Sequence, residues 1–421
     1  MSSKLTQEAT AAAAAVSADR LWSTLMAMAE IGARPDGGVC RQALTVEDRE
    51  ARDLLIGWAR GRGYGVSVDP AANLFVRRPG RQDVAPVLAG SHMDSQPAGG
   101  RFDGIYGVLA AFEALVALDE AGIETERPVD MVAWTNEEAG RFACGCTGSI
   151  SWSGHAPLED FLPVVGTDGV VLRDALEETL AAAPDVERIG LGSEVHAYIE
   201  PHIEQGPVLE SKGLPIAAVT SIQGLRWFSV EVDGRAGHAG TTPMTGRKDA
   251  FQGALRAIEA LNALMADDTD TVRFTVGRIE VEPNSPNTIP SLARFTVDFR
   301  HPEEAVLTAL GDRVADVAAE AAAPCTVQVT QTSRMAPDAF PETMVALIED
   351  AARSLDLGVI RLASGAFHDA LFTAKACPTA MIFVPCRDGI SHHPAEYAKP
   401  EDLAAGTRVL TACLVELANR I

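Results

Sequence analysis

The amino-acid sequence predicts an α/β protein with a central mixed, largely parallel sheet flanked by helices, and with an α+β domain inserted into it. Short apolar runs typical of buried strands alternate with helical segments of ten or more residues through the first half of the chain. From residue 214 to residue 331 the pattern changes, and the first pattern then returns. We therefore expect one domain from residues 1–213 and 332–421 and a second domain from residues 214–331.

Apolar periodicity places the elements of the first domain. They are expected at Asp19–Ile31 (helix), Thr45–Arg62 (helix), Tyr64–Val76 (a strand pair), Val84–Ala89 (strand), Val108–Leu118 (helix), Val129–Trp134 (strand), Val195–Ile199 (strand) and Thr379–Val384 (strand). Thr45 can cap its helix, with Asp48 three residues later. Residues 1–18 are expected to be a frayed or helical, flexible tail, because the run from Ala11 to Ala15 is too short and too weakly apolar for a signal sequence.

The inserted block predicts a four-stranded sheet with two helices on one face. Its strands are expected at Trp227–Val232, Val272–Ile279, Ala293–Phe299 and Thr326–Thr332, and its helices at Arg247–Ala266 and Pro302–Ala323.

Composition limits the partners and the compartment. A formal net charge of -23 disfavours nucleic acid and anionic membranes as partners. No apolar stretch is long enough to span a bilayer. The seven cysteines are odd in number and scattered, which favours a reducing cytoplasm over a disulfide framework. Cys144 and Cys146 are interpreted as packing or bystander thiols.

A glycine-rich loop follows the strand Val84–Ala89 and carries His92, Asp94 and Asp103. Neutral imidazole and carboxylate oxygen are ligands that Zn, Mn and Co accept. An N-cap aspartate, a surface histidine and ordinary turn glycines explain this one loop equally well.

Three further loops carry similar side chains after predicted strands, where α/β sheets form their sites. Glu137 and Glu138 are adjacent at a strand end and point to opposite sides, so one can hold a metal while the other takes a proton from a water molecule. A solvated surface pair is the alternative for these two residues alone. His202 follows another strand, and His392 with His393 follows Thr379–Val384. Four such loops together favour a metal centre.

The order of six motifs resembles a known family. They are Gly-Ser-His-Met-Asp-Ser, Gly-Gly-Arg-Phe-Asp-Gly, Thr-Asn-Glu-Glu, His-Ile-Glu-Gln-Gly, Gly-His-Ala-Gly-Thr-Thr-Pro-Met and Gly-Ile-Ser-His. From about residue 20 to its end the chain is similar to the zinc-dependent amidohydrolase branch of the metallo-aminoacylases and exopeptidases. This branch contains N-carbamoyl-L-amino acid hydrolases, allantoate amidohydrolases and β-ureidopropionases. His202 places the chain in this branch, because the related peptidases typically have a carboxylate there.

The resemblance implies two divalent metal ions per chain, of Zn, Mn, Co or Ni. His92 and His202 would hold one ion, Glu138 and His392 the other, and Asp103 would bridge them. Glu137 would be the general base, and Asp94 would orient His92 through its free ring nitrogen. His238 would stabilise the oxyanion, and Asn287 and Arg300 would bind the substrate carboxylate. Gln205 and His368 would line the pocket, with Gln96 a weaker candidate. His238 would act in its own subunit or from a partner, and Arg300 could instead be an ordinary ion-pair partner.

The implied protein is a cytoplasmic homodimer whose inserted domain is both lid and dimer contact, acting on a small carboxylate. It would cleave a ureido C–N bond of an N-carbamoyl-L-amino acid or an allantoate-like acid, releasing ammonia and CO2. An N-acyl amino acid deacylase or a dipeptidase on the same scaffold is the alternative, and a non-catalytic binding protein is a third possibility. One departure bears on the substrate: Phe367 stands where the family usually has a glycine beside His368.

Overall fold

The computed structural model describes residues 5–419. The chain divides into two compact units, residues 1–220 with 340–421, and residues 221–339. These boundaries lie later than the expected ones at 214 and 331. The first boundary is later because β7 (Ile216–Ile222) pairs with β17 (Thr379–Val384) in the sheet of the first unit. The second is later because β14 (Thr326–Met335) pairs with β8 (Gly224–Asp233) in the sheet of the second unit.

The first unit is built on a ten-stranded mixed sheet in the order β15-β7-β17-β6-β3-β4-β2-β1-β5, with β16 paired to β7. Its edge strand β15 (Asp338–Ala339) falls at the last two residues of the second unit. Its remaining strands are β1 (Gly65–Val68), β2 (Leu74–Arg78), β3 (Val87–His92), β4 (Val129–Trp134), β5 (Glu187–Arg188), β6 (Ala197–Ile203) and β16 (Val359–Ser364). The four neighbours β17, β6, β3 and β4 run parallel, so their carboxyl ends share one edge. The predicted fold class is confirmed.

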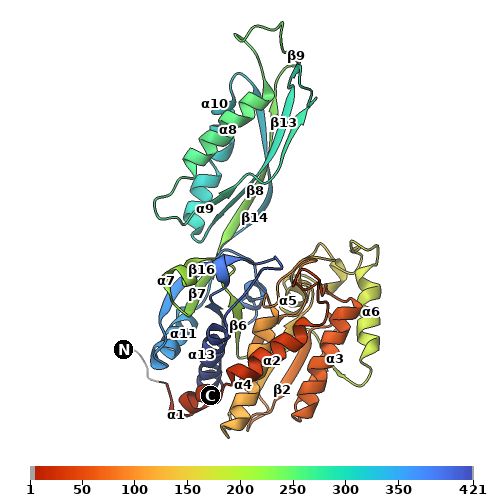
Figure 1. Ribbon diagram of the computed structural model, residues 1–421, viewed down its shortest axis with the longest axis vertical. Helices are drawn as coiled ribbons and strands as arrows, with labels where there is room; N and C mark the ends of the chain where they lie inside the picture. The colour runs from red at the N-terminus through yellow and green to blue at the C-terminus, as the bar shows by residue number, and fades with distance from the viewer. Residues whose placement is uncertain (1–4, 420–421) are drawn as a thin grey trace. The chain divides into compact units, whose positions relative to one another are not determined.

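Helices cover this sheet (Figure 1). They are α1 (Gln7–Ala14), α2 (Ala18–Ala29), α3 (Val46–Gly61), α4 (Ile105–Glu120), α5 (Thr147–Trp152), α6 (Leu172–Ala182), α7 (Val208–Lys212), α11 (Glu342–Ser354), α12 (Ala370–Thr373) and α13 (Pro400–Ala418), with 3-10 turns at Leu158–Asp160 and Arg387–Gly389. Helix α4 is buried from Ile105 to Leu118 because it packs between β3 and α13. Its near-uniform apolar sequence is typical of such an interior helix.

The flexible tail expected at residues 1–18 needs correction. Residues 7–14 form α1, whose Ala9, Ala12 and Ala13 are buried against α13. The backbone N–H of Thr6 also donates to Glu416 at 2.7 Å. Residues 1–4 of the expected tail lie outside the described residues.

The second unit has a sheet in the order β10-β13-β8-β14, with β11 also paired to β13. Its elements are β8 (Gly224–Asp233), β9 (Gly237–His238), α8 (Ala250–Leu264), β10 (Arg273–Thr275), β11 (Ile279–Glu282), β12 (Thr288–Ile289), β13 (Leu292–His301), α9 (Glu304–Gly311), α10 (Val314–Ala322) and β14 (Thr326–Met335). The strand expected at Val272–Ile279 is in fact two short strands, β10 and β11, that pair with different parts of β13. One apolar core joins the three helices to a single face of this sheet.

Among residues 5–419, no helix is long and apolar enough to cross a membrane.

Candidate metal centre

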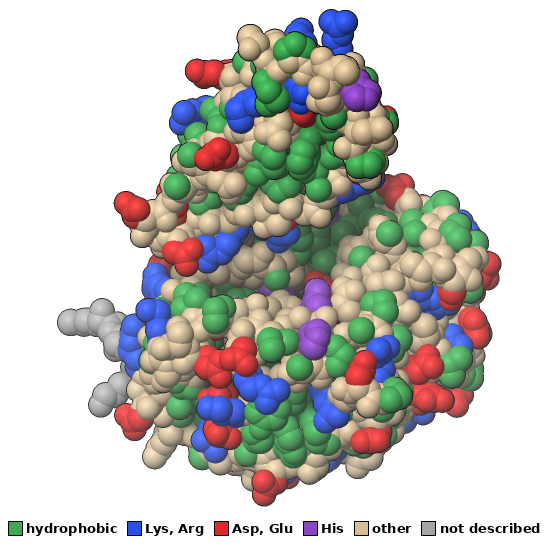
Figure 2. Space-filling model, turned by 45° about the horizontal axis from the view of Figure 1, so that its top comes forward, with side chains coloured by type: hydrophobic (Ala, Val, Ile, Leu, Met, Phe, Trp, Pro, Cys, Tyr) green, Lys and Arg blue, Asp and Glu red, His purple; other side chains and the backbone are tan. Residues whose placement is uncertain are grey.

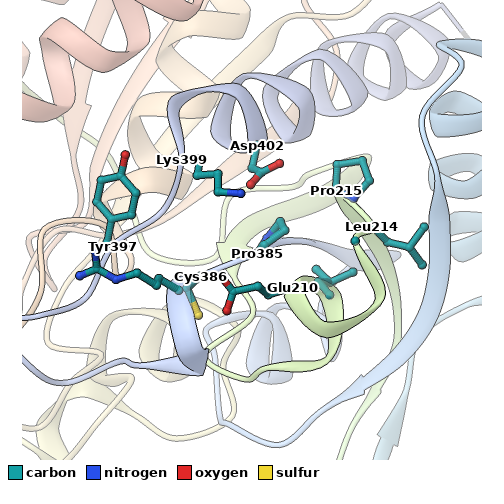
Figure 3. A pocket seen from close by; sticks show the side chains of 11 residues that line it. Glu210, Leu214, Pro215, Pro385, Cys386, Tyr397, Lys399 and Asp402 are labelled. Carbon is teal, nitrogen blue, oxygen red and sulfur yellow. The ribbon is translucent and has the colours of Figure 1, made fainter.

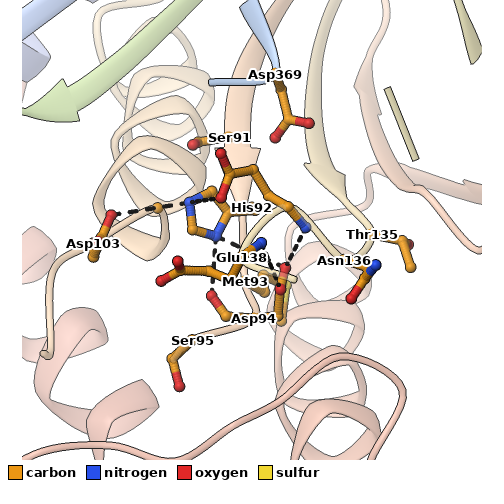
Figure 4. Close-up of polar contacts among 12 residues, drawn as sticks. Ser91, His92, Met93, Asp94, Ser95, Asp103, Thr135, Asn136, Glu138 and Asp369 are labelled. Carbon is orange, nitrogen blue, oxygen red and sulfur yellow. Dashed lines mark hydrogen bonds and ion pairs between the residues drawn. The ribbon is translucent and has the colours of Figure 1, made fainter. Parts of the chain in front are cut away.

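The parallel strands of the first unit bring distant histidines and carboxylates to one edge of the sheet. Two groups form there: His92, Asp103 and His202, and Asp103, Glu138 and His392. Within each group the candidate donor atoms all lie within 4.8 Å of one another. Asp103 belongs to both groups, so the five residues form one cluster. Figure 4 shows His92, Asp103 and Glu138 beside the Asp94 loop.

The two oxygens of the Asp103 carboxylate face different partners. Oδ1 lies 3.2 Å from His202 Nε2 and 4.0 Å from His92 Nε2. Oδ2 lies 3.3 Å from His392 Nε2, which is itself 3.3 Å from Glu138 Oε2. A carboxylate in this position can share one oxygen with each of two neighbouring cations.

Backbone carbonyls fix the orientation of the two buried imidazoles. His92 Nδ1 lies 2.9 Å from the carbonyl oxygen of Asp94, and His202 Nδ1 lies 2.9 Å from that of Ile203. A carbonyl only accepts, so each Nδ1 carries a proton and each Nε2 is the nitrogen left to face Asp103 or a metal. Both Nε2 atoms point towards Asp103, which is the arrangement of a histidine ready to hold a metal.

Asp94 acts on this loop differently from the expectation. Its carboxylate oxygen is 3.8 Å from His92 Nδ1, so the backbone carbonyl of Asp94, and not its side chain, orients the imidazole. The carboxylate instead accepts the backbone N–H groups of Glu137 and Glu138, each at 3.2 Å. Asp94 therefore connects the loop after β3 to the loop after β4.

Glu137 lies beside the cluster, with Oε2 3.6 Å from His92 Nε2. Burial raises the pKa of its carboxyl well above the ordinary range, and the neighbouring Glu138 raises it further. Burial likewise raises the pKa of Glu138 to about 8, with Asp103 adding to the shift. A bound cation would stabilise these crowded carboxyls in their ionised form.

Asp103 also raises the pKa values of His202 and His392, because its negative charge favours the protonated rings. The hydrogen bond to Asp103 raises the pKa of His392 to about 9. Burial alone lowers the pKa of His202, but Asp103 outweighs it and raises that pKa to about 9. Burial alone would also raise the pKa of Asp103, but its hydrogen bonds to these two histidines hold it well below its ordinary value.

Gln205 is closer to the cluster than a general pocket residue would be. Its Nε2 donates to Asp103 Oδ2 at 2.9 Å and to Ser391 Oγ at 3.1 Å. Its Oε1 is buried and has no hydrogen-bond partner within residues 5–419. The amide that carries this unsatisfied buried oxygen contacts Asp103 and His392 of the cluster, which favours a positive or donating group bound there. The donor set thus fits divalent cations of the kind that accept nitrogen and oxygen ligands.

Two residues at the cluster were not assigned a role from the sequence. Ser391 Oγ donates to Asp103 Oδ2 at 2.7 Å. Glu396 Oε1 accepts the backbone N–H groups of Phe102 and Asp103, at 2.9 and 3.1 Å. Ser391 lies in the Gly-Ile-Ser-His motif and could have been found there, whereas Glu396 has no local signal. Gln96, the weaker candidate, donates to Glu138 Oε2 at 2.7 Å.

His368 is buried with 1% of its surface exposed, and its ring centroid lies 4.5 Å from that of His202. Its Nε2 lies 3.0 Å from Ser364 Oγ. Its ring packs edge-on against the His202 ring and helps to hold that ring in place. His392 is 50% exposed, so the cluster reaches the surface. Figure 2 shows in purple the histidine side chains that are exposed on one face of the molecule.

Three predicted site residues belong to the second unit. His238 in β9 pairs with Thr288 in β12, and the carbonyl of Asn287 accepts the N–H of Ala239 at 2.9 Å. Both His238 and Asn287 are exposed. Arg300 forms an ion pair with Asp298 at 2.8 Å, which is the alternative that the sequence left open.

The ring of His238 has a defined tautomer. Its Nδ1 accepts the backbone N–H groups of Gly240 and Thr241, at 3.1 and 3.2 Å. The proton of the neutral ring is therefore on Nε2, which is free to donate a hydrogen bond.

A separate cavity of about 210 Å³ lies between α7, the loop after β17 and the start of α13 (Figure 3). Its lining includes Glu210, Cys386, Arg387, Lys399 and Asp402. Positive and negative groups are mixed there, so the cavity shows no preference for one charge.

Comparison with known proteins places this geometry in a family. The model of peptidase family M20/M25/M40 matches residues 88–416, which include every residue of the cluster. The chain belongs to this family. The resemblance inferred from the motifs is confirmed.

Individual M20 relatives cover nearly the whole chain. An N-carbamoyl-L-amino-acid amidohydrolase of Rhizobium meliloti is 38% identical over 96% of this chain and 97% of its own length. An allantoate amidohydrolase of Bacillus subtilis is 34% identical over 93% of this chain and 95% of its own. The crystal structure of a hydantoinase/carbamoylase family amidase from Burkholderia multivorans matches with a TM-score of 0.90 and 44% identity, over 96% of this chain and 98% of that one.

Proposed function

We propose that this M20 protein is a metal-dependent amidohydrolase that cleaves the carbamoyl group of an N-carbamoyl-L-amino acid or an allantoate-like acid. The observation that carries the proposal is the shared carboxylate of Asp103, with one oxygen towards His202 and the other towards His392. Full-length similarity to amidohydrolases of this substrate class supports the choice of bond.

The five residues of the cluster would hold two divalent ions. His92 and His202 would hold the first, Glu138 and His392 the second, and Asp103 would bridge them. When bound, such ions polarise a carbonyl group and lower the pKa of a water molecule. Zn, Mn, Co and Ni all accept these ligands.

Glu137 would move the proton in this reaction. Its carboxylate takes a proton from the attacking water, and the resulting acid returns the proton to the leaving nitrogen. Water adds to the carbamoyl carbon, one C–N bond breaks, and the carbamic acid that remains loses CO2. The products are the free amino acid, ammonia and CO2.

The second unit would bind the rest of the substrate. The Nε2–H of His238 is a suitable donor for the oxygen that becomes negative in the transition state. Asn287 and Arg300 remain candidates for binding the substrate carboxylate. Arg300 would then break its ion pair with Asp298 and pair with the substrate carboxylate instead. A lid movement and a homodimer through this unit, and a cytoplasmic location, remain part of the proposal. The edge strand β14 supports the dimer, because it pairs with β8 on one side only.

Ammonia release from metal-loaded protein tests this function. The panel contains N-carbamoyl-L-amino acids, N-carbamoyl-β-alanine and allantoate, with N-acetyl amino acids and dipeptides followed through the free amine. We expect ammonia from a ureido compound and its loss after chelation. Cleavage of acyl or peptide bonds alone would establish the alternative deacylase or dipeptidase, for which Phe367 beside His368 is the residue to examine.

A further inference from the structure

The loop after β4 places a thiol directly against the side chain of Glu137. Cys146 precedes α5 and has a left-handed backbone, with φ of 55°. Its N–H donates to the carbonyl of Glu137 at 3.1 Å, and its Sγ lies 3.7 Å from Glu137 Oε1. The same residue therefore holds Glu137 at both its backbone and its carboxylate.

The Cys146 thiol is protonated and can donate a hydrogen bond. Cys146 is 5% exposed, and burial together with the charge of Glu137 raises the pKa of its thiol well above the ordinary value. The sulfur thus keeps its proton, and a carboxylate oxygen within its reach is the acceptor. Long sulfur–oxygen distances are normal for such hydrogen bonds because sulfur is large.

Within residues 5–419, this thiol is the hydrogen-bond donor that reaches Oε1 of Glu137. The opposite oxygen, Oε2, faces His92 Nε2 at 3.6 Å. The nearby Asp369 is a buried acid whose Oδ1 accepts from Ser149 and whose Oδ2 has no partner among the described residues. Without the thiol, Oε1 would have no hydrogen-bond donor among the described residues.

We propose that Cys146 is a positioning residue for Glu137: its thiol anchors Oε1, so that Oε2 stays directed at the metal cluster. The inference deepens the proposed function, because it rests on Glu137 as the base. The sequence alone indicated a bystander thiol, since nothing in the residue spacing reveals that Cys146 returns to Glu137.

Cys144 is the matched control. It lies in the same loop, but its sulfur accepts hydrogen bonds from the hydroxyl of Thr147 and the side-chain amide of Asn136. This sulfur makes no hydrogen bond with Glu137 among the described residues. The variants are Cys146→Ala, Cys146→Ser and Cys144→Ala, each measured for metal content, unfolding temperature, kcat and KM on the best ureido substrate.

We expect Cys146→Ala to lower kcat about ten-fold, the size expected for one lost hydrogen bond to a charged group. KM, metal content and unfolding temperature should stay near wild type, because the thiol does not touch the ligands. Cys146→Ser should recover most of the rate, since its hydroxyl still donates, and Cys144→Ala should keep all of it. An unchanged kcat in Cys146→Ala, or an equal loss in Cys146→Ser, would overturn the proposal.

A second measurement does not depend on activity. The infrared S–H stretching band of Cys146, identified by its absence in Cys146→Ala, should lie at lower frequency than that of a free thiol. In Glu137→Ala the band should move to higher frequency. Glu137→Gln, with a neutral acceptor, should move it less in the same direction, and it replaces the alanine variant if that variant does not fold. A band that does not move in either variant rejects the contact, whereas a shifted band in a protein inactive on all ureido compounds rejects the proposed function and keeps the contact.

Discussion

Glu396 accepts the backbone N–H of Asp103 at 3.1 Å. Asp103 is the residue shared by both groups of candidate ligands, so a carboxylate 293 positions away in the sequence anchors the centre of the cluster. The same Oε1 accepts the N–H of Phe102, and Ser391 lies between Glu396 Oε2 and Asp103 Oδ2. The loops after β3 and β17 are thereby held together.

Glu396→Ala should therefore weaken metal binding without removing a ligand. We expect a loss of about ten- to a hundred-fold in affinity, the usual range for residues that orient ligands. Calorimetric titration with Zn²⁺ or Mn²⁺ measures it. Glu396→Gln is the matched variant, since its amide oxygen can still accept both N–H groups, and it should lose less. Equal affinity in Glu396→Ala and wild type would contradict this role.

Gly104, in the loop between β3 and α4, is a position where only glycine fits. Its φ is 65°, and a Cβ there would overlap the ring of His92. Gly104→Ala should lose metal affinity as well as stability, because the imidazole has to move. Gly122 has the same φ of 65° and open space around it, so Gly122→Ala reports the backbone strain alone, of about 1 kcal/mol. Thermal unfolding and metal titration of the two variants should differ, and the same result for both would show that the His92 ring is not constrained by this glycine.

Much of the site could be predicted because it depends on strand ends. Residues at or just after the carboxyl ends of buried parallel strands, such as His92 in β3 and Glu138 after β4, must meet at one edge of the sheet once the fold class is known. The contacts that organise them could not be predicted in this way. Asp94 uses its carbonyl for His92 and its carboxylate for the next loop, and Cys146 returns to Glu137, because turn geometry decides these contacts and apolar periodicity carries no information about it.

Two features of the fold were also not predictable from apolar periodicity. The split of the expected strand Val272–Ile279 into β10 and β11 arises in an edge strand, which only β13 constrains. Residues 1–18 were expected to be a frayed or helical tail because their alanine run is short and weakly apolar, although its small side chains are what allow α1 to pack closely against α13.

Metal uptake should release protons. In the metal-free protein the pKa values of His202 and His392 are raised to about 9, so both rings are largely protonated at pH 7. A metal binds the neutral ring, so protons compete with it, and the apparent affinity should rise with pH until about pH 9. Titration of metal in buffers of different ionisation enthalpy at pH 7 should give up to two protons released per chain from these rings, and up to one more from Glu138, whose pKa is raised to about 8. Uptake with no proton release would mean that neither histidine is a ligand.

Glu137→Gln separates the base from the ligands. Glutamine keeps the volume of the side chain and can still accept from Cys146, but it cannot take a proton from water. We expect metal content and unfolding temperature near wild type and a fall in kcat of about 10²- to 10⁴-fold, the usual contribution of a general base. Glu138→Gln is the informative comparison. Because Glu138 faces His392 as a candidate metal ligand, this variant should lose bound metal as well as kcat. If Glu137→Gln turned over at the wild-type rate while Glu138→Gln kept its metal but not its activity, the roles of the two adjacent glutamates would be exchanged.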